Sequence, residues 1–197
     1  MQLTGQQKRA FRELGYTVLR GVIPQVMIDD ALRAINHSLG YEGMAKDDLP
    51  RLRAQSYCNE VQKTPPITDL MNRSPVFPLV ESMLGEGNLQ EVVAGQIALR
   101  FPIELSDDPS PPHGHLDGLG SGLNGSAKGS YNRGFTALAV ILLSELKDDF
   151  SGNFTVWPRS HAFFESYFKE HGHEVLEQGM PRVALPEGPV MLQGQPG

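Results

Sequence analysis

The chain has 197 residues and a formal net charge of −6 at pH 7. This length suits one domain with its own hydrophobic core. No dense run of lysine and arginine is present, which argues against a nucleic-acid partner. The single cysteine, Cys58, excludes an internal disulfide framework and fits a reducing compartment. Because no stretch has the length and apolarity of a signal peptide or a membrane span, we expect a cytoplasmic protein with no membrane partner.

The first 87 residues have the pattern of a mainly helical part. Capping residues and apolar residues at helical spacing predict four helices. The expected helices run from Thr4 to Gly15, from Pro24 to Gly40, and over two short stretches at 68–71 and 75–84. Between the first two helices, residues 16–22 are rich in β-branched and aromatic side chains and are expected to form a strand.

Residues 88–197 have the pattern of strands. The expected strands are 90–101, 135–143, 153–157, 181–185 and 188–192. The continuous apolar run at 135–143 predicts a strand buried on both faces. A further helix is expected from Ser160, as its cap, to Gly172. Helices followed by strands predict a single α+β domain, 1–197, whose β part forms a barrel or jelly roll.

The most informative stretch is His113-Gly-His115-Leu-Asp117-Gly. Residues two apart on a strand face the same side, so His115 and Asp117 would present an imidazole nitrogen and a carboxylate oxygen together. These are two of the three ligands in the facial triad of non-haem Fe(II) oxygenases. The other interpretation is a surface loop with incidental polar residues, because so short a pattern often arises by chance. The Gly/Ser-rich stretch that follows, 119–134, fits either a mobile lid or an ordinary loop.

A second set of polar residues lies on the expected strand 90–101. Alternation places Gln96 and Arg100 on one face with two alanines, which suits a polar pocket better than a packed core. A guanidinium group can bind a carboxylate through two parallel hydrogen bonds. The alternative is a surface salt bridge at the end of the strand.

Three motifs in the same order resemble the phytanoyl-CoA hydroxylase family. Residues 11–24, Phe-Arg-Glu-Leu-Gly-Tyr-Thr-Val-Leu-Arg-Gly-Val-Ile-Pro, resemble its opening segment, and His115-Leu-Asp117 follows. Residues 152–161, Gly-Asn-Phe-Thr-Val-Trp-Pro-Arg-Ser-His, resemble its Gly-x-Leu-x-x-x-Pro-Gly-Ser-His signature, with Arg159 in place of the usual glycine. The resemblance covers the chain from about Phe11 to its end.

This resemblance implies an Fe(II)- and 2-oxoglutarate-dependent oxygenase on a double-stranded β-helix, with the helices packed outside. His115 and Asp117 match the first two iron ligands, and Arg100, with Gln96 as a weaker choice, would help to hold 2-oxoglutarate. His161 matches a histidine that is not a ligand and is expected to have a structural role. The carboxylate of Asp117 favours hydroxylation over halogenation. The substrate would be a small organic molecule, with dioxygen as co-substrate.

In the family, a histidine ligand and an arginine that binds 2-oxoglutarate follow a glycine-led turn. The sequence reaches such a turn at Pro196-Gly197, so we expect the last core strands to be missing and the 197 residues alone to show little turnover. Two alternatives stay open. One is a cupin-like jelly roll that binds without turnover, although His113-Gly-His115 lacks the glutamate that a cupin motif requires. The other is an inactive fragment.

Overall fold

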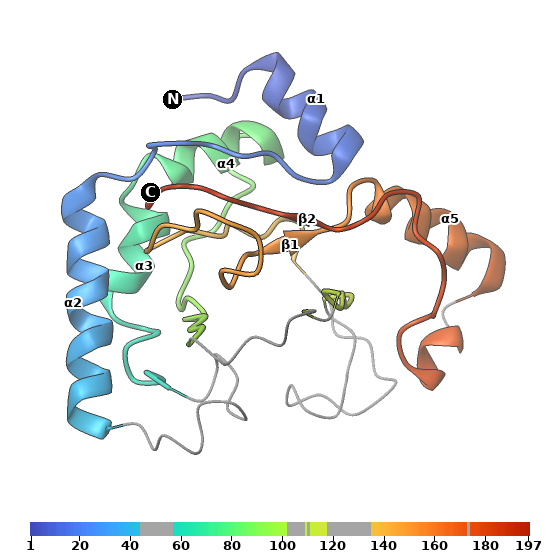
Figure 1. Cartoon of the computed structure of the whole chain (residues 1–197). Helices are drawn as coiled ribbons and strands as arrows, with labels where there is room; N and C mark the ends of the chain where they lie inside the picture. The colour runs from blue at the N-terminus through green and yellow to red at the C-terminus, as the bar shows by residue number, and fades with distance from the viewer. Residues whose placement is uncertain (44–56, 102–108, 110, 118–134, 173) are drawn as a thin grey trace.

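The computed structural model of the chain describes residues 1–43, 57–101, 109, 111–117, 135–172 and 174–197. Helices make up most of its regular structure (Figure 1). In chain order the α-helices are α1 (Gly5–Leu14), α2 (Gln25–Glu42), α3 (Pro65–Asn72), α4 (Val76–Leu84) and α5 (Ser160–His171). The strands are β1 (Thr155–Val156) and β2 (Val190–Met191), and a 3-10 helix, Glu174–Gln178, follows α5.

Helix α1 begins and ends as its sequence predicts. The hydroxyl of Thr4 accepts a hydrogen bond from the backbone N–H of Gln7 at 3.2 Å, and the Gln7 side chain accepts one from the Thr4 N–H at 2.8 Å. This reciprocal pair satisfies two of the backbone donors that a helix start leaves open. Gly15 ends the helix with φ 86°, a left-handed conformation that favours glycine.

Helix α2 starts at Gln25, with Pro24 as its N-cap instead of its first residue, and its predicted end at Gly40 is wrong. The helix continues to Glu42, and Gly43, with φ 75°, donates its N–H to the carbonyl of Leu39 at 3.0 Å. A glycine inside a helix costs only about 1 kcal/mol relative to alanine, so Gly40 does not have to end the helix. The two short helices are confirmed as α3 and α4.

The strands are fewer than predicted. No strand is found at 16–22, 90–101, 135–143 or 181–185 within the described residues, although 153–157 and 188–192 contain β1 and β2. These two strands pair antiparallel, with Thr155 opposite Met191. A strand needs a neighbour for its backbone N–H and C=O groups. The bonds of Val22 N–H and Ile23 N–H to the single carbonyl of Gly197, at 2.7 and 3.1 Å, do not form such a ladder.

The C-terminal segment extends the pairing of β2 along the chain. Leu146 and Gly194 exchange backbone hydrogen bonds at 2.9 and 3.0 Å, and the N–H of Gly197 donates to the carbonyl of Leu142 at 3.0 Å. Residues 190–197 therefore run antiparallel to 142–156 and reach the segment before α2 through Val22 and Ile23. The jelly roll implied by the resemblance stays a prediction.

The hydrophobic core lies where α2 packs on α3, on one side of the molecule (Figure 1). Ile28 and Ala31 of α2 are completely buried, which agrees with their helical spacing. The core residues are Ile23, Ile28, Ala31, Ile35, Tyr57, Cys58, Val61, Ile67, Leu70, Met71, Val76 and Ile97. Ile97 attaches the segment before residue 102 to this helical core.

The prediction that 135–143 is buried on both faces is wrong. Ile141 and Leu143 pack against the core, but Phe135 and Leu138 are 56% and 53% exposed. Burial on both faces needs a packed layer on each side. In the described residues the packed layer lies on the side of this segment that carries Ile141 and Leu143. Phe135 and Leu138 have no such layer and stay exposed.

Cys58 is completely buried beneath α2, and burial raises the pKa of its thiol. Because the thiolate is the reactive form, we expect iodoacetamide at pH 8 to label native Cys58 at least about tenfold more slowly than the unfolded chain. Mass spectrometry of timed aliquots measures both rates, and free glutathione is the control for reagent activity. Equal rates in native and unfolded protein would contradict this burial.

Candidate metal centre

The segment 111–117 alternates in burial except at Gly114, which is exposed. The side chains of His113, His115 and Asp117 are exposed, whereas Pro112 and Leu116 are half-buried. His115 Nε2 lies 3.2 Å from Asp117 Oδ1, with 81% and 53% of the two side chains exposed. The prediction that these two groups lie together is therefore confirmed: a nitrogen and an oxygen lie side by side and are accessible from solvent.

Further metal ligands can be sought among the described residues. Within those ranges, no group of three or more histidine, cysteine, aspartate or glutamate side chains is arranged to hold a metal ion. The pair His115 and Asp117 supplies two suitable donor atoms. Their role as iron ligands stays a prediction, and so does the origin of a third ligand.

Arg100 and Gln96 are exposed, while Ile97 between them is buried. This agrees with the predicted alternation. The guanidinium Nη1 of Arg100 donates to the adjacent carbonyl of Leu99 at 3.0 Å, and Arg100 has no acidic partner within the described ranges. A guanidinium without a carboxylate partner can accept an anionic ligand. Contact of either residue with 2-oxoglutarate stays a prediction.

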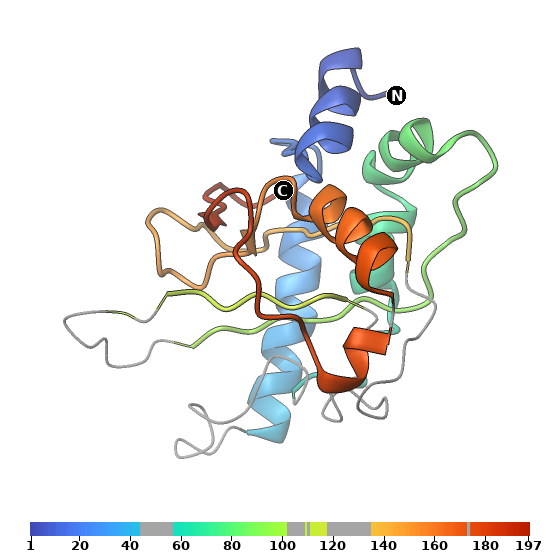
Figure 2. The ribbon, with the colours of Figure 1, turned by 90° about the vertical axis from the view of Figure 1, so that its right-hand side faces the viewer.

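His161 has the structural role that the sequence predicts. Its Nε2 lies 3.0 Å from the carbonyl of Arg12, which can only accept, so this nitrogen carries the proton. The ring also packs on Gly15, because a Cβ atom there would lie 2.5 Å from His161 Nδ1. His161 thereby joins the start of α5 to the end of α1, and Figures 1 and 2 show these ends close together.

Two other described histidines lie on helices and have exposed side chains. His37 is exposed on α2, and His171 is exposed in the last turn of α5, where its Nδ1 lies 3.0 Å from the carbonyl of Tyr167. His173 and the Gly/Ser-rich stretch 119–134 lie outside the described residues.

The backbone conformation at 152–161 explains why the family signature has glycine at two of its positions. Gly152 has φ 84°, and Arg159, at the position where the signature has glycine, has φ 63°. Both values lie in the left-handed region, which costs a non-glycine residue about 1–2 kcal/mol. Arg159 also precedes α5 without a side-chain cap, so the predicted capping role of Ser160 is wrong. Two independent positions of the signature therefore have the conformation that glycine favours.

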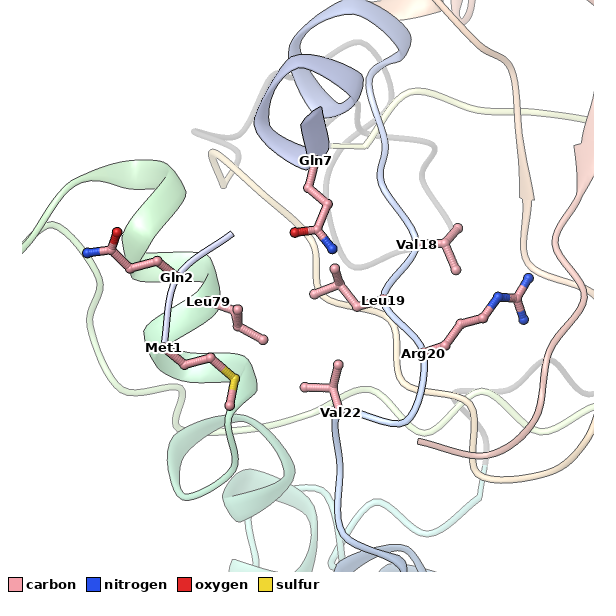
Figure 3. A pocket seen from close by; sticks show the side chains of 8 residues that line it. All are labelled: Met1, Gln2, Gln7, Val18, Leu19, Arg20, Val22 and Leu79. Atoms are coloured by element: carbon pink, nitrogen blue, oxygen red, sulfur yellow. The ribbon is translucent and has the colours of Figure 1, made fainter. Parts of the chain in front are cut away.

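Two surface cavities lie away from the His115–Asp117 pair. A cavity of about 430 Å³ lies between α1, α4 and the segment before α2 (Figure 3), and its ionisable side chain is Arg20. A second cavity, of about 550 Å³, is lined by Lys8, Arg9 and Arg12 of α1 together with His161 and apolar side chains. No signal in the sequence marked these three cations as functional. Their positions in α1 place basic groups next to one another, but this spacing is common on solvated helices.

No protein-family model matches this chain, and no curated protein or solved structure was found to be similar to it. The family resemblance therefore rests on the motifs alone. Among the described residues, no helix combines the length and apolarity that crossing a membrane requires.

Proposed function

We propose that this chain is an Fe(II)- and 2-oxoglutarate-dependent oxygenase of the phytanoyl-CoA hydroxylase type, which hydroxylates a small organic substrate in the cytoplasm. The observation that supports this most directly is the exposed pair in which His115 Nε2 lies 3.2 Å from Asp117 Oδ1. The left-handed backbone at Gly152 and Arg159 adds support from a second motif, because a glycine at each position would adopt it readily.

The donor atoms fit the proposed metal. An imidazole nitrogen and a carboxylate oxygen are two members of the donor set of non-haem Fe(II) oxygenases. When bound, Fe(II) supplies the activation of dioxygen, with 2-oxoglutarate as the co-substrate. His115 has to be neutral to donate its nitrogen, and the charge of the Asp117 carboxylate would partly balance that of the ion. Arg100, and more weakly Gln96, would bind a carboxylate group of 2-oxoglutarate.

The direct test measures succinate formation and oxygen consumption by the purified chain, incubated with Fe(II), ascorbate and 2-oxoglutarate in air. Succinate formation and oxygen consumption that both require Fe(II) would support the oxygenase. Binding of Mn(II), a redox-quiet substitute, without any succinate would fit the cupin-like binding protein, and equally the little turnover expected of these 197 residues alone. If the chain neither binds Mn(II) nor forms succinate, both functions are rejected for these 197 residues.

The role of Arg100 has a separate test. If the chain turns over 2-oxoglutarate, Arg100→Ala should raise the apparent KM for it by about tenfold or more, because a bidentate charge-assisted contact is lost. Arg100→Lys should recover part of this loss, since lysine keeps the charge without the planar fork. Arg73→Ala is a matched control, because Arg73 pairs with Glu91 at 2.7 Å on the surface. An unchanged KM in Arg100→Ala would assign Arg100 to the surface.

A further inference from the structure

The segment that carries the candidate ligands packs on an aromatic ring. A Cβ atom added to Gly114 would lie 2.9 Å from Cζ3, 3.1 Å from Cη2 and 3.2 Å from Cε3 of Trp157. These three atoms belong to the six-membered ring of the indole, so the ring occupies the space into which a side chain at Gly114 would project, while Gly114 itself stays exposed. Any side chain at this position would displace either the ring or the segment.

Gly114 lies between the two histidines of the motif and directly before His115. His115 and Asp117 are exposed, Pro112 and Leu116 are half-buried, and Gly114 is exposed. The Cβ position of Gly114 meets Trp157, while the side chains of the candidate ligands are exposed. A rigid ring behind a short segment limits the positions that its exposed side chains can take.

Trp157 is itself held on both sides. It directly follows β1, whose pairing with β2 sets the register of the backbone, and it directly precedes Pro158, which is buried. At the other end of the same segment, a Cβ atom on Gly152 would lie 2.9 Å from the Cβ of Arg100. Residues 152–157 therefore contact the backbone of the candidate metal segment at one end and Arg100 at the other.

From this contact we propose that Trp157 is a positioning residue for the His115–Asp117 pair, acting through the backbone of Gly114. The proposal rests on the proposed function, because it assigns Trp157 a part in holding the metal ligands. Residues that orient metal ligands typically change metal affinity by about 10–100-fold when they are replaced. Trp157 would exert this effect through packing, since its ring lies on the backbone that precedes a ligand.

The contact can be tested without metal. Trp157 is the single tryptophan of the chain, so its ring signals are unambiguous. In the native protein we expect nuclear Overhauser effects between its six-membered ring and the Gly114 α-protons, and ring-current shifts of those protons that disappear in Trp157→Leu. Absence of both signals in folded protein would overturn the proposal at its first step.

The consequence is tested by titration with Mn(II), followed by electron paramagnetic resonance of the free ion. Trp157→Leu should weaken the Mn(II) binding that depends on His115 and Asp117 by about tenfold. Trp157→Phe keeps a ring against Gly114 and should recover most of the affinity, whereas Gly114→Ala should lose affinity because its methyl group meets the indole. Phe154→Leu makes the same kind of change at an exposed position, 38% accessible, and should leave affinity within twofold. Circular dichroism checks that each variant is folded.

The outcomes separate the two ideas. If Mn(II) binding depends on His115 and Asp117 but is unchanged in Trp157→Leu and Gly114→Ala, Trp157 has no positioning role and the proposed metal site survives. If the ring contact is present but native protein shows no Mn(II) binding that depends on the pair, the metal site fails. The positioning role then fails with it, and the contact is packing only.

Discussion

Asp117→Ala is expected to lower the Mn(II) affinity of the chain by more than about tenfold, and to abolish any Fe(II)-dependent formation of succinate. The reason is the loss of the only anionic donor in the pair, whose Oδ1 lies 3.2 Å from His115 Nε2. Loss of a residue that only orients a ligand costs about 10–100-fold in affinity, so loss of a ligand itself should cost at least as much. His115→Ala should have a comparable effect, because it removes the other donor.

His113→Ala is the matched control for both variants. His113 is exposed on the same side of the same segment, two residues before His115. Its replacement should leave Mn(II) affinity within about twofold if His113 is only a neighbour of the site. Unchanged Mn(II) binding in both Asp117→Ala and His115→Ala would show that the ion binds elsewhere. A loss in His113→Ala as large as that in His115→Ala would instead make His113 a ligand.

Gly15→Ala should destabilise the folded chain by about 2 kcal/mol or more. Gly15 has φ 86°, and a left-handed conformation costs alanine about 1–2 kcal/mol. The new methyl group would also lie 2.5 Å from His161 Nδ1, and the His161 ring is held by its hydrogen bond to the Arg12 carbonyl. Overlap with a held side chain adds to the backbone strain. Urea denaturation followed by circular dichroism measures the free energy of unfolding.

Gly21→Ala separates the two contributions. Gly21 has φ 62°, and nothing lies within 4 Å of an added Cβ, so this variant has the backbone strain without the overlap. In the double variant Gly15→Ala, His161→Ala, the overlap is absent, and the loss should be smaller than the sum of the single losses. Equal losses in Gly15→Ala and Gly21→Ala, with additive effects in the double variant, would mean that His161 does not pack on Gly15 in solution.

Local signals in the sequence were sufficient where each structure depends on neighbouring residues. Thr4 and Gln7 form the capping box of α1, and Gly15 ends that helix, because each acts within one or two turns. The alternation of exposed and buried residues from Gln96 to Arg100 was likewise predictable, since it follows from an extended backbone alone.

The strand predictions were wrong where the outcome depends on which segment lies opposite. The β-branched residues at 16–22 and the apolar run at 135–143 suggest strands, but a strand forms only where another segment pairs with it. In the described residues that partner is the segment 190–197, which pairs at β1 and at Leu146. Strand propensity therefore indicated candidate segments, and tertiary pairing decided which of them became strands.

The candidate site divides in the same way. The sequence predicts that His115 and Asp117 share a side, because they are two positions apart on an extended chain. The place of Trp157 next to Gly114 and the link that His161 makes between α5 and the end of α1 follow from the folded chain alone, since these contacts join residues 43 and 149 positions apart. Sequence spacing carries no information about such contacts, because they depend on how the whole chain packs.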